Sequence, residues 1–150
     1  MKIVYKYDNL IVADVVNRPS KEIKSPYLAD ILIKKKKHLA HSPGLGLCGF
    51  ITTDSVVAVS ESDSEKRKSK YTIELVKVKN DDNKNIWVGA NPATSNLYFN
   101  NIIEKNLLSF LPKIDLIKRE FKMTGFESRF DFYLETNNKK KFIIEVKNVP

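Results

Sequence analysis

The chain has 150 residues, of which 42% are hydrophobic and 29% charged, so it can form one ordinary domain or two small ones. Its 26 Lys and Arg exceed its 18 Asp and Glu, and the net charge of +8 favours nucleic acid or another polyanion as partner, although a lysine-rich solvated surface explains it equally. The single cysteine, Cys48, excludes an intrachain disulfide and a cysteine zinc site. No apolar run matches a signal peptide or the roughly 20 residues of a membrane span, so we expect a soluble cytoplasmic protein without a membrane partner.

The first half of the chain predicts short strands separated by polar loops. Runs rich in β-branched and aromatic residues predict strands at 3–7, 10–16, 27–33, 55–60, 71–78 and 86–90. Residues 38–50 contain three glycines and a proline, which predicts an irregular excursion of the backbone. Such a series of strands with a basic surface fits a small OB-like β-barrel that binds nucleic acid, and we assign it to residues 1–85.

The apolar period changes after residue 90. Spacings of three and four predict an amphipathic helix at 93–110, which Asn91 and Pro92 begin and Pro112 ends. A strand at 114–122, a turn at 124–127 and two strands around Asn137-Asn138 follow. The fold class is therefore α+β and mostly β, with a helix-plus-mixed-sheet half assigned to residues 86–150.

The last two strands carry the clearest chemical pattern, within SRFDFYLETNNKKKFIIEVKN. If they pair around the turn, alternation places Asp131, Glu145 and Lys147 on one face. Two carboxylates suit Mg²⁺ or Mn²⁺, which can polarise a phosphate and lower the pKa of bound water. Lys147 could orient that water or stabilise charge in the transition state. The pattern predicts a nuclease-like metal site, and a surface strand with a Glu145–Lys147 salt bridge and a hydrogen-bonded Asp131 explains it as well.

Further residues extend this candidate site and a nucleic-acid-binding surface. Glu120 is a third candidate metal ligand, and Arg129 could hold a phosphate bidentately. His41 could contact a phosphate or stabilise its own loop. Four lysines could follow a nucleic-acid backbone, with a solvated strand end as the alternative: Lys34, Lys35, Lys36 and Lys37. Arg18, Lys21 and Lys24 precede a strand and could line the groove of an OB-type barrel. No dinucleotide fingerprint is present.

Four segments, NRPSKEIKSPYLADI, AHSPGLGLCG, VGANPATSN and SRFDF…FIIEVKNV, resemble in order the sugar fermentation stimulation protein A family. The resemblance spans nearly the whole chain. It implies an N-terminal OB-fold, a domain of the PD-(D/E)xK nuclease type, and DNA binding. The acid of that superfamily matches Asp131 and its acid-x-lysine matches Glu145 and Lys147, while the histidine of the family matches His41.

Two departures from the family accompany the resemblance. The basic motif of the family is Asn17-Arg18-Pro19 here. The family continues with a further helix and strand, so we expect the nuclease-like half to be incomplete in this chain, or completed by a second chain or a homo-oligomer. Three functions stay open: a DNA-binding protein of regulation or DNA processing, an active Mg²⁺-dependent nuclease, and a non-enzymatic interaction module with a relic site. RNA is a possible partner in the first two.

Overall fold

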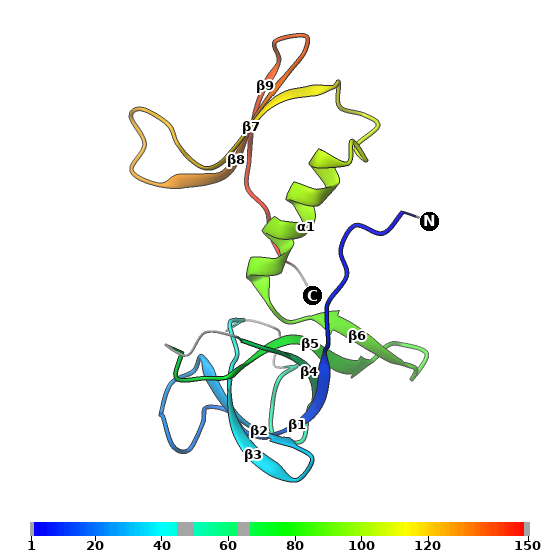
Figure 1. Ribbon diagram of the computed structural model, residues 1–150, viewed down its shortest axis with the longest axis vertical. Coiled ribbons are helices and arrows are strands. Elements are labelled where there is room, and N and C mark those ends of the chain that lie inside the picture. The colour runs from blue at the N-terminus through cyan, green and yellow to red at the C-terminus, as the bar shows by residue number, and fades with distance from the viewer. Residues whose placement is uncertain (1, 45–49, 63–66, 149–150) are drawn as a thin grey trace. The chain divides into compact units, whose positions relative to one another are not determined.

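The computed structural model describes residues 2–44, 50–62 and 67–148 (Figure 1). Residues 45–49 of the predicted excursion, among them Cys48, lie outside these residues. The chain divides into two compact units, one from Tyr7 to Ala93 and the other from Thr94 to Lys147 together with the N-terminal residues up to Lys6. No helix in the described part is long and apolar enough to cross a membrane.

The first unit is a β-barrel. Its strands are β1 (Ile11–Asn17), β2 (Leu28–Ile33), β3 (Lys36–His41), β4 (Val56–Glu61), β5 (Tyr71–Lys79) and β6 (Asn85–Gly89). They lie in the order β3-β2-β1-β4-β5-β6, and a parallel pairing of β3 with β5 closes the barrel, Ala40 opposite Tyr71. Every other pairing is antiparallel. This neighbour order, 1-2-3-5-4-1 around the barrel, is that of an OB-fold, so the predicted OB-like, mostly β architecture is confirmed.

The barrel core follows the two-residue period of its strands. Ala13 and Val15 point inward from β1, and Val57 and Val59 point inward from β4, each fully or almost fully buried. Apolar residues of the other strands complete the same cluster, among them Ile31 and, on β5, Ile73 and Val76. Burial of this cluster from water is the main force that holds the barrel closed.

The structure differs from the predictions for the first half in three details. Residues 3–7 form no strand, and the Val4 carbonyl instead accepts a hydrogen bond from Asn101 Nδ2 at 3.1 Å in the second unit. Conversely, β3 occupies the start of the segment expected to be irregular, because its Gly and Pro residues begin only at Pro43. The expected boundary after residue 85 falls before β6, which pairs with β5, so the first compact unit extends to Ala93.

The second unit packs one helix against a sheet. The helix α1 (Pro92–Glu104) precedes β7 (Ile114–Lys122), β8 (Arg129–Thr136) and β9 (Lys141–Ile144). The sheet order is β7-β8-β9, and both pairings are antiparallel because short turns join the strands, so the described strands do not form the expected mixed sheet. Ile103, Phe132 and Leu134 form its buried core, and the Phe99 and Phe132 ring centroids lie 5.0 Å apart.

The helix begins as predicted but ends earlier. Asn91 Oδ1 accepts a hydrogen bond from the Ala93 N–H at 3.2 Å, and Pro92 is the first helical residue. At the other end Asn106 has φ 50°, and the Leu107 N–H donates to the Ile102 carbonyl at 3.0 Å. This left-handed residue with its six-to-one hydrogen bond is a Schellman motif. Asn106, rather than Pro112, therefore ends the helix.

Candidate functional site

The predicted hairpin of β8 and β9 is confirmed. Phe132 pairs with Ile144 and Tyr133 with Ile143, and the Thr136 N–H donates to the Lys140 carbonyl at 2.9 Å across the turn. The next step of this register places Asp131 level with Glu145, just past the end of β9. This register therefore brings the two predicted acids to the same level of the sheet, and alternation decides which face they share.

Asp131 is held by two donors. Its Oδ1 accepts a hydrogen bond from Asn96 Nδ2 of α1 at 2.9 Å, and its Oδ2 accepts one from the Val146 N–H at 2.7 Å. The side chain is half-buried. A carboxylate has about four acceptor sites, so this carboxylate is fixed in position and keeps acceptor capacity. Sequence reasoning missed Asn96, because a polar residue in the first turns of a helix is common without any such role.

Glu145 and Lys147 form an ion pair, with Nζ and Oε1 2.7 Å apart, and both side chains are exposed. The hydrogen bond and charge of Glu145 raise the pKa of Lys147 above its usual value, and the charge of Asp131 adds to the shift. Lys147 is thus protonated at neutral pH, which suits a charge-stabilising role better than that of a base. The sequence also allowed an alternative to a metal site, namely a Glu145–Lys147 salt bridge and a hydrogen-bonded Asp131. Both of these interactions are present in the structure.

Glu120 lies level with Asp131 on β7, which flanks β8 on the side opposite to β9. Arg119 pairs with Phe132 and Phe121 with Phe130, so Glu120 occupies the intervening position of β7, at φ 48°. Three carboxylates therefore lie in one row across the strands. Their side chains do not converge: nowhere in residues 2–44, 50–62 and 67–148 do three His, Cys, Asp or Glu side chains form a group that could hold a metal ion.

The donor set nevertheless fits a hard cation. Asp131 and Glu145 offer carboxylate oxygens, which Mg²⁺ and Mn²⁺ prefer, and a cation of this kind needs only one or two protein carboxylates because it keeps several waters. The exposure of Glu145 leaves room for such waters. Arg129, the predicted phosphate ligand, begins β8 opposite Lys122 and is exposed.

In the barrel, Arg18 binds the backbone. Its Nη1 donates to the Ile51 carbonyl at 3.2 Å and its Nη2 to the Gly44 carbonyl at 2.6 Å. Burial lowers the pKa of this guanidinium below its usual range. Arg18 thus joins two loops, and contact with nucleic acid stays a prediction for it.

The predicted lysines lie in two loops of the barrel. Lys21 and Lys24 are exposed between β1 and β2. Lys34 and Lys35 form the two-residue turn between β2 and β3, with φ 48° and 65°, so strand alternation does not apply to them. Lys36 and Lys37 begin β3, and Lys37 Nζ lies 3.2 Å from Glu22 and 3.3 Å from Asp30.

His41 lines a pocket of about 410 Å³ at the end of β3. Its Nδ1 lies 3.4 Å from Arg67 Nη2. Burial lowers the pKa of His41, the charge of Arg67 lowers it further, and that of Glu74 opposes the shift. The imidazole is thus neutral at neutral pH. Sequence reasoning missed Glu74, although an acid between Ile73 and Leu75 in an apolar strand was a usable signal.

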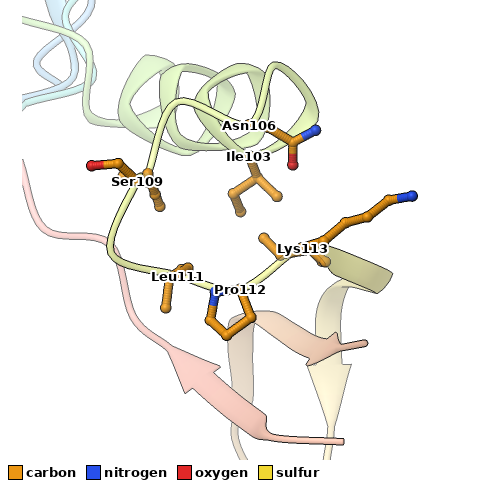
Figure 2. Close-up of a pocket in the computed structure, with 8 residues that line it drawn as sticks. Ile103, Asn106, Ser109, Leu111, Pro112 and Lys113 are labelled. Carbon is orange, nitrogen blue, oxygen red and sulfur yellow. The ribbon is translucent and has the colours of Figure 1, made fainter. Parts of the chain in front are cut away.

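A second pocket, of about 330 Å³, lies between the end of α1 and the start of β7 (Figure 2). Ile103 points toward it and the Lys113 ammonium points away. Leu108, Leu111 and Ile114 add apolar walls. None of the residues predicted for catalysis or binding lines this pocket, so we assign it no part in the candidate site.

The class of this protein is therefore an OB-like barrel followed by a helix-and-sheet unit. The sheet of the second unit carries an acid and a Glu-x-Lys sequence at one level. The chain belongs to the sugar fermentation stimulation protein A family. The family model described as the sugar fermentation stimulation protein RE domain matches residues 93–150.

Individual relatives also match this chain. The chain is 40% identical over 124 residues to a sugar fermentation stimulation protein homolog of Pelagibacter ubique, covering 82% of this chain and 50% of that protein. It is 32% identical over 147 residues to the homolog of Acaryochloris marina, covering 97% and 57%. The solved structure of Pyrococcus furiosus SfsA in complex with Ca²⁺ has a TM-score of 0.78 at 19% identity, over 97% of this chain and 57% of that one. The chain thus spans half to about 57% of these relatives.

Proposed function

We propose that this protein binds nucleic acid through its barrel, with DNA as the expected partner, and acts in regulation or DNA processing. The observation that carries the proposal is the Lys34-Lys35 turn. Two positive φ angles in a two-residue hairpin loop are typical of a type I′ turn, in which Asn-Gly is favoured. Lysine in this conformation costs roughly 1–2 kcal/mol per residue. A backbone strained in this way to present two ammonium groups is explained by a ligand that needs them.

The topology supports the same reading. Barrels of this type bind oligonucleotides with the face of the second and third strands and the loops beside it. Lys21 and Lys24 occupy the loop before β2, and Arg67 and Lys68 the loop before β5, all of them exposed. Basic groups at these places can neutralise phosphates, which predicts an affinity that falls steeply with salt.

We further propose that Asp131 and Glu145, with Glu120 beside them, hold a divalent metal ion, Mg²⁺ or Mn²⁺. The calcium complex of the Pyrococcus furiosus protein and the donor set support this. A metal bound there would polarise a phosphodiester and lower the pKa of bound water. Asn96 and Val146 orient the Asp131 carboxylate, and the protonated Lys147 supplies positive charge next to the site. Hydrolysis of phosphodiesters is the second candidate function, and a relic site in an interaction module is the third.

Two measurements separate these functions. Gel shifts of single-stranded and double-stranded DNA and RNA at increasing salt test binding; affinity that ignores salt, or no binding by the folded protein, argues for the interaction module. Cleavage of the same substrates over a titration of Mg²⁺ and Mn²⁺ tests the site. Asp131→Asn and Lys147→Ala should each abolish cleavage and leave binding intact.

Glu135→Gln is the matched control, since this acid lies on the same strand and pairs with Lys139 at 3.9 Å, away from the Asp131 level. Glu135→Gln should change neither nucleic-acid binding nor cleavage. Cleavage that survives Asp131→Asn and Lys147→Ala, or that needs no metal, would place the chemistry elsewhere. Binding without cleavage by the unaltered protein at any metal concentration leaves nucleic-acid binding as its function.

A further inference from the structure

The β7–β8 hairpin continues past β9 as a two-stranded ribbon (Figure 1). β9 pairs with residues 132–135 of β8, whereas pairing with β7 continues to Arg129, which lies opposite Lys122. Both side chains are exposed, and neither forms an ion pair or a hydrogen bond in the part of the chain that the structure describes. The Cβ atoms of directly opposite residues lie about 4.5–5.5 Å apart, and like charges at such a pair destabilise a hairpin. An anion bound between the two cations removes this repulsion.

The tip of the ribbon is a defined turn that presents an aromatic ring. The Phe126 N–H donates to the Met123 carbonyl at 3.1 Å, and Gly125 between them has φ 88°. A positive φ at the third position of a four-residue turn is typical of a type II turn, which favours glycine there. The Phe126 ring packs edge-on against Phe130, with the ring centroids 5.7 Å apart, yet it is 49% exposed. The turn and this contact fix the ring beside the cation pair and leave part of it open to a ligand.

A ring beside two cations fits a strand of nucleic acid. Aromatic side chains stack on unpaired bases, while neighbouring basic side chains neutralise phosphates. Glu127 is the only acid among residues 122–129, so the cations outnumber the acids there. By strand alternation, Arg129 shares a face of β8 with Asp131, about 7 Å away along the strand. A strand held at Arg129 therefore passes close to the candidate metal site.

We propose that residues 122–129 form a binding site for an unpaired nucleic-acid strand. Lys122 and Arg129 hold a phosphate between them, and Phe126 stacks on an adjoining base. This inference rests on the proposed nucleic-acid binding and adds a contact in the second unit, which presents the strand to Asp131.

An anionic membrane surface is the rival partner, because a basic segment with an exposed apolar ring can also bind lipid. The position of Arg129 two residues from Asp131 favours the strand, since a phosphodiester is the substrate proposed for that site.

The cation pair is tested by anisotropy of a labelled oligothymidine strand that binds the full chain at increasing salt. Lys122→Gln combined with Arg129→Gln should weaken binding and lower the log–log salt slope by about 1, for one lost phosphate contact. The matched control, Lys140→Gln combined with Lys141→Gln, removes two exposed lysines at the other end of β8 and should leave the slope unchanged. Glu127→Gln should tighten binding about twofold, a gain that loss of folding cannot imitate.

The aromatic ring is tested by Phe126→Ala. Loss of one stacked base should weaken binding of the oligothymidine strand about tenfold and leave the salt slope unchanged, because stacking neutralises no phosphate. Binding of a fully paired hairpin duplex should not change. Phe110→Ala removes another exposed ring of the same unit and should affect neither substrate. A Phe126→Ala protein that binds the single strand like the unaltered protein, or that loses duplex binding equally, overturns the stacking role.

The outcomes separate this proposal from the proposed function. Strand binding that depends on Lys34 and Lys35 but is unchanged in all the variants of residues 122–129 overturns the tip site and leaves the barrel as the binding surface. Strand binding that the tip variants weaken, and that Lys34→Gln combined with Lys35→Gln does not, supports the tip site and refutes the barrel surface. Absence of any strand binding overturns both, and binding to phosphatidylglycerol vesicles that Phe126→Ala abolishes then identifies a membrane as the partner.

Discussion

At the scale of single residues, Asp30 shows how a buried charge can support the barrel. It is 1% exposed and accepts hydrogen bonds from Ser20 Oγ at 2.5 Å and from the Lys21 N–H at 3.1 Å, with Lys37 Nζ 3.3 Å away. Burial by itself would raise the pKa of this carboxyl, but the hydrogen bonds and the charge of Lys37 outweigh it and hold the pKa below its usual value. The network fixes the loop that carries Lys21 and Lys24.

Asp30→Asn should lower the free energy of unfolding by about 1–3 kcal/mol at pH 7, because the buried donors lose a charged acceptor. The folded-state pKa lies below the unfolded one, so this stabilisation is present above the unfolded value and is lost as pH falls through the folded one. Urea denaturation should therefore show a difference between the two proteins that shrinks below about pH 4. Asp14→Asn, on an exposed position of β1, is the control and should stay within about 0.5 kcal/mol. A difference that grows in acid would contradict this reading.

At the scale of elements, the turn of the β2–β3 hairpin combines a strained backbone with the positive charges of Lys34 and Lys35. Replacing Lys34-Lys35 by Asn-Gly supplies the residues that a type I′ turn favours and removes two positive charges. We expect the barrel to gain about 1–2 kcal/mol in urea denaturation. We also expect nucleic-acid binding to weaken and its log–log salt slope to fall by about 1 for each lost phosphate contact.

Two controls separate charge from strain in this hairpin. The pair Lys34→Gln and Lys35→Gln removes the charges but keeps the left-handed backbone, so binding should weaken without a gain in stability. The pair Lys77→Gln and Lys79→Gln removes two exposed charges from β5 and should change binding less. Unchanged binding by the Asn-Gly variant would remove the observation on which the proposed nucleic-acid surface rests.

The elements differ in how far the sequence predicts them. Strands with clear alternation, such as β4 and β5, are predicted within a residue or two, because their period is a local signal. The β8–β9 hairpin is also predicted from its period and turn residues, but its last strand is expected to run through Glu145 and Lys147, whereas β9 ends at Ile144. β3 was missed because its KKHLAH sequence has no alternation, and it forms as a strand through pairing with β2 and β5. The end of α1 was missed because the left-handed Asn106 resembles any exposed helical residue in sequence. For the candidate site, the level of Asp131 and Glu145 was predictable from register, whereas the Asn96 contact and the Glu74 pocket depend on tertiary packing.

At the scale of the whole molecule, the two units have separate cores of unequal size. The barrel buries a continuous cluster contributed by all of β1 to β5. The second unit has only Ile103, Phe132 and Leu134 as fully buried members in its described core, with partly buried residues around them. Because stability follows the apolar surface removed from water, we expect the second unit to be the less stable of the two.

Phe132→Ala tests this independence. Truncation of a buried phenylalanine costs about 3–5 kcal/mol, which is comparable to the stability that so small a core can supply. We expect α1 and the β7–β9 sheet to unfold while the barrel stays folded. The only tryptophan of the chain, Trp87, lies on β6 and reports the barrel by fluorescence, whereas far-UV circular dichroism at the helical band reports α1. The helical signal of the variant should be lost already without urea or at low urea, well before the fluorescence changes.

Phe110→Ala is the matched control, since this ring is 78% exposed and its loss should leave both transitions where they are. Coincident transitions in the Phe132→Ala protein would mean that the two units unfold as one.

Separate transitions have a functional consequence that can be measured in the same sample. If the barrel binds nucleic acid by itself, Phe132→Ala should retain salt-dependent binding. The same variant should lose any metal-dependent cleavage, because Asp131 and Glu145 lose the sheet that holds them at one level.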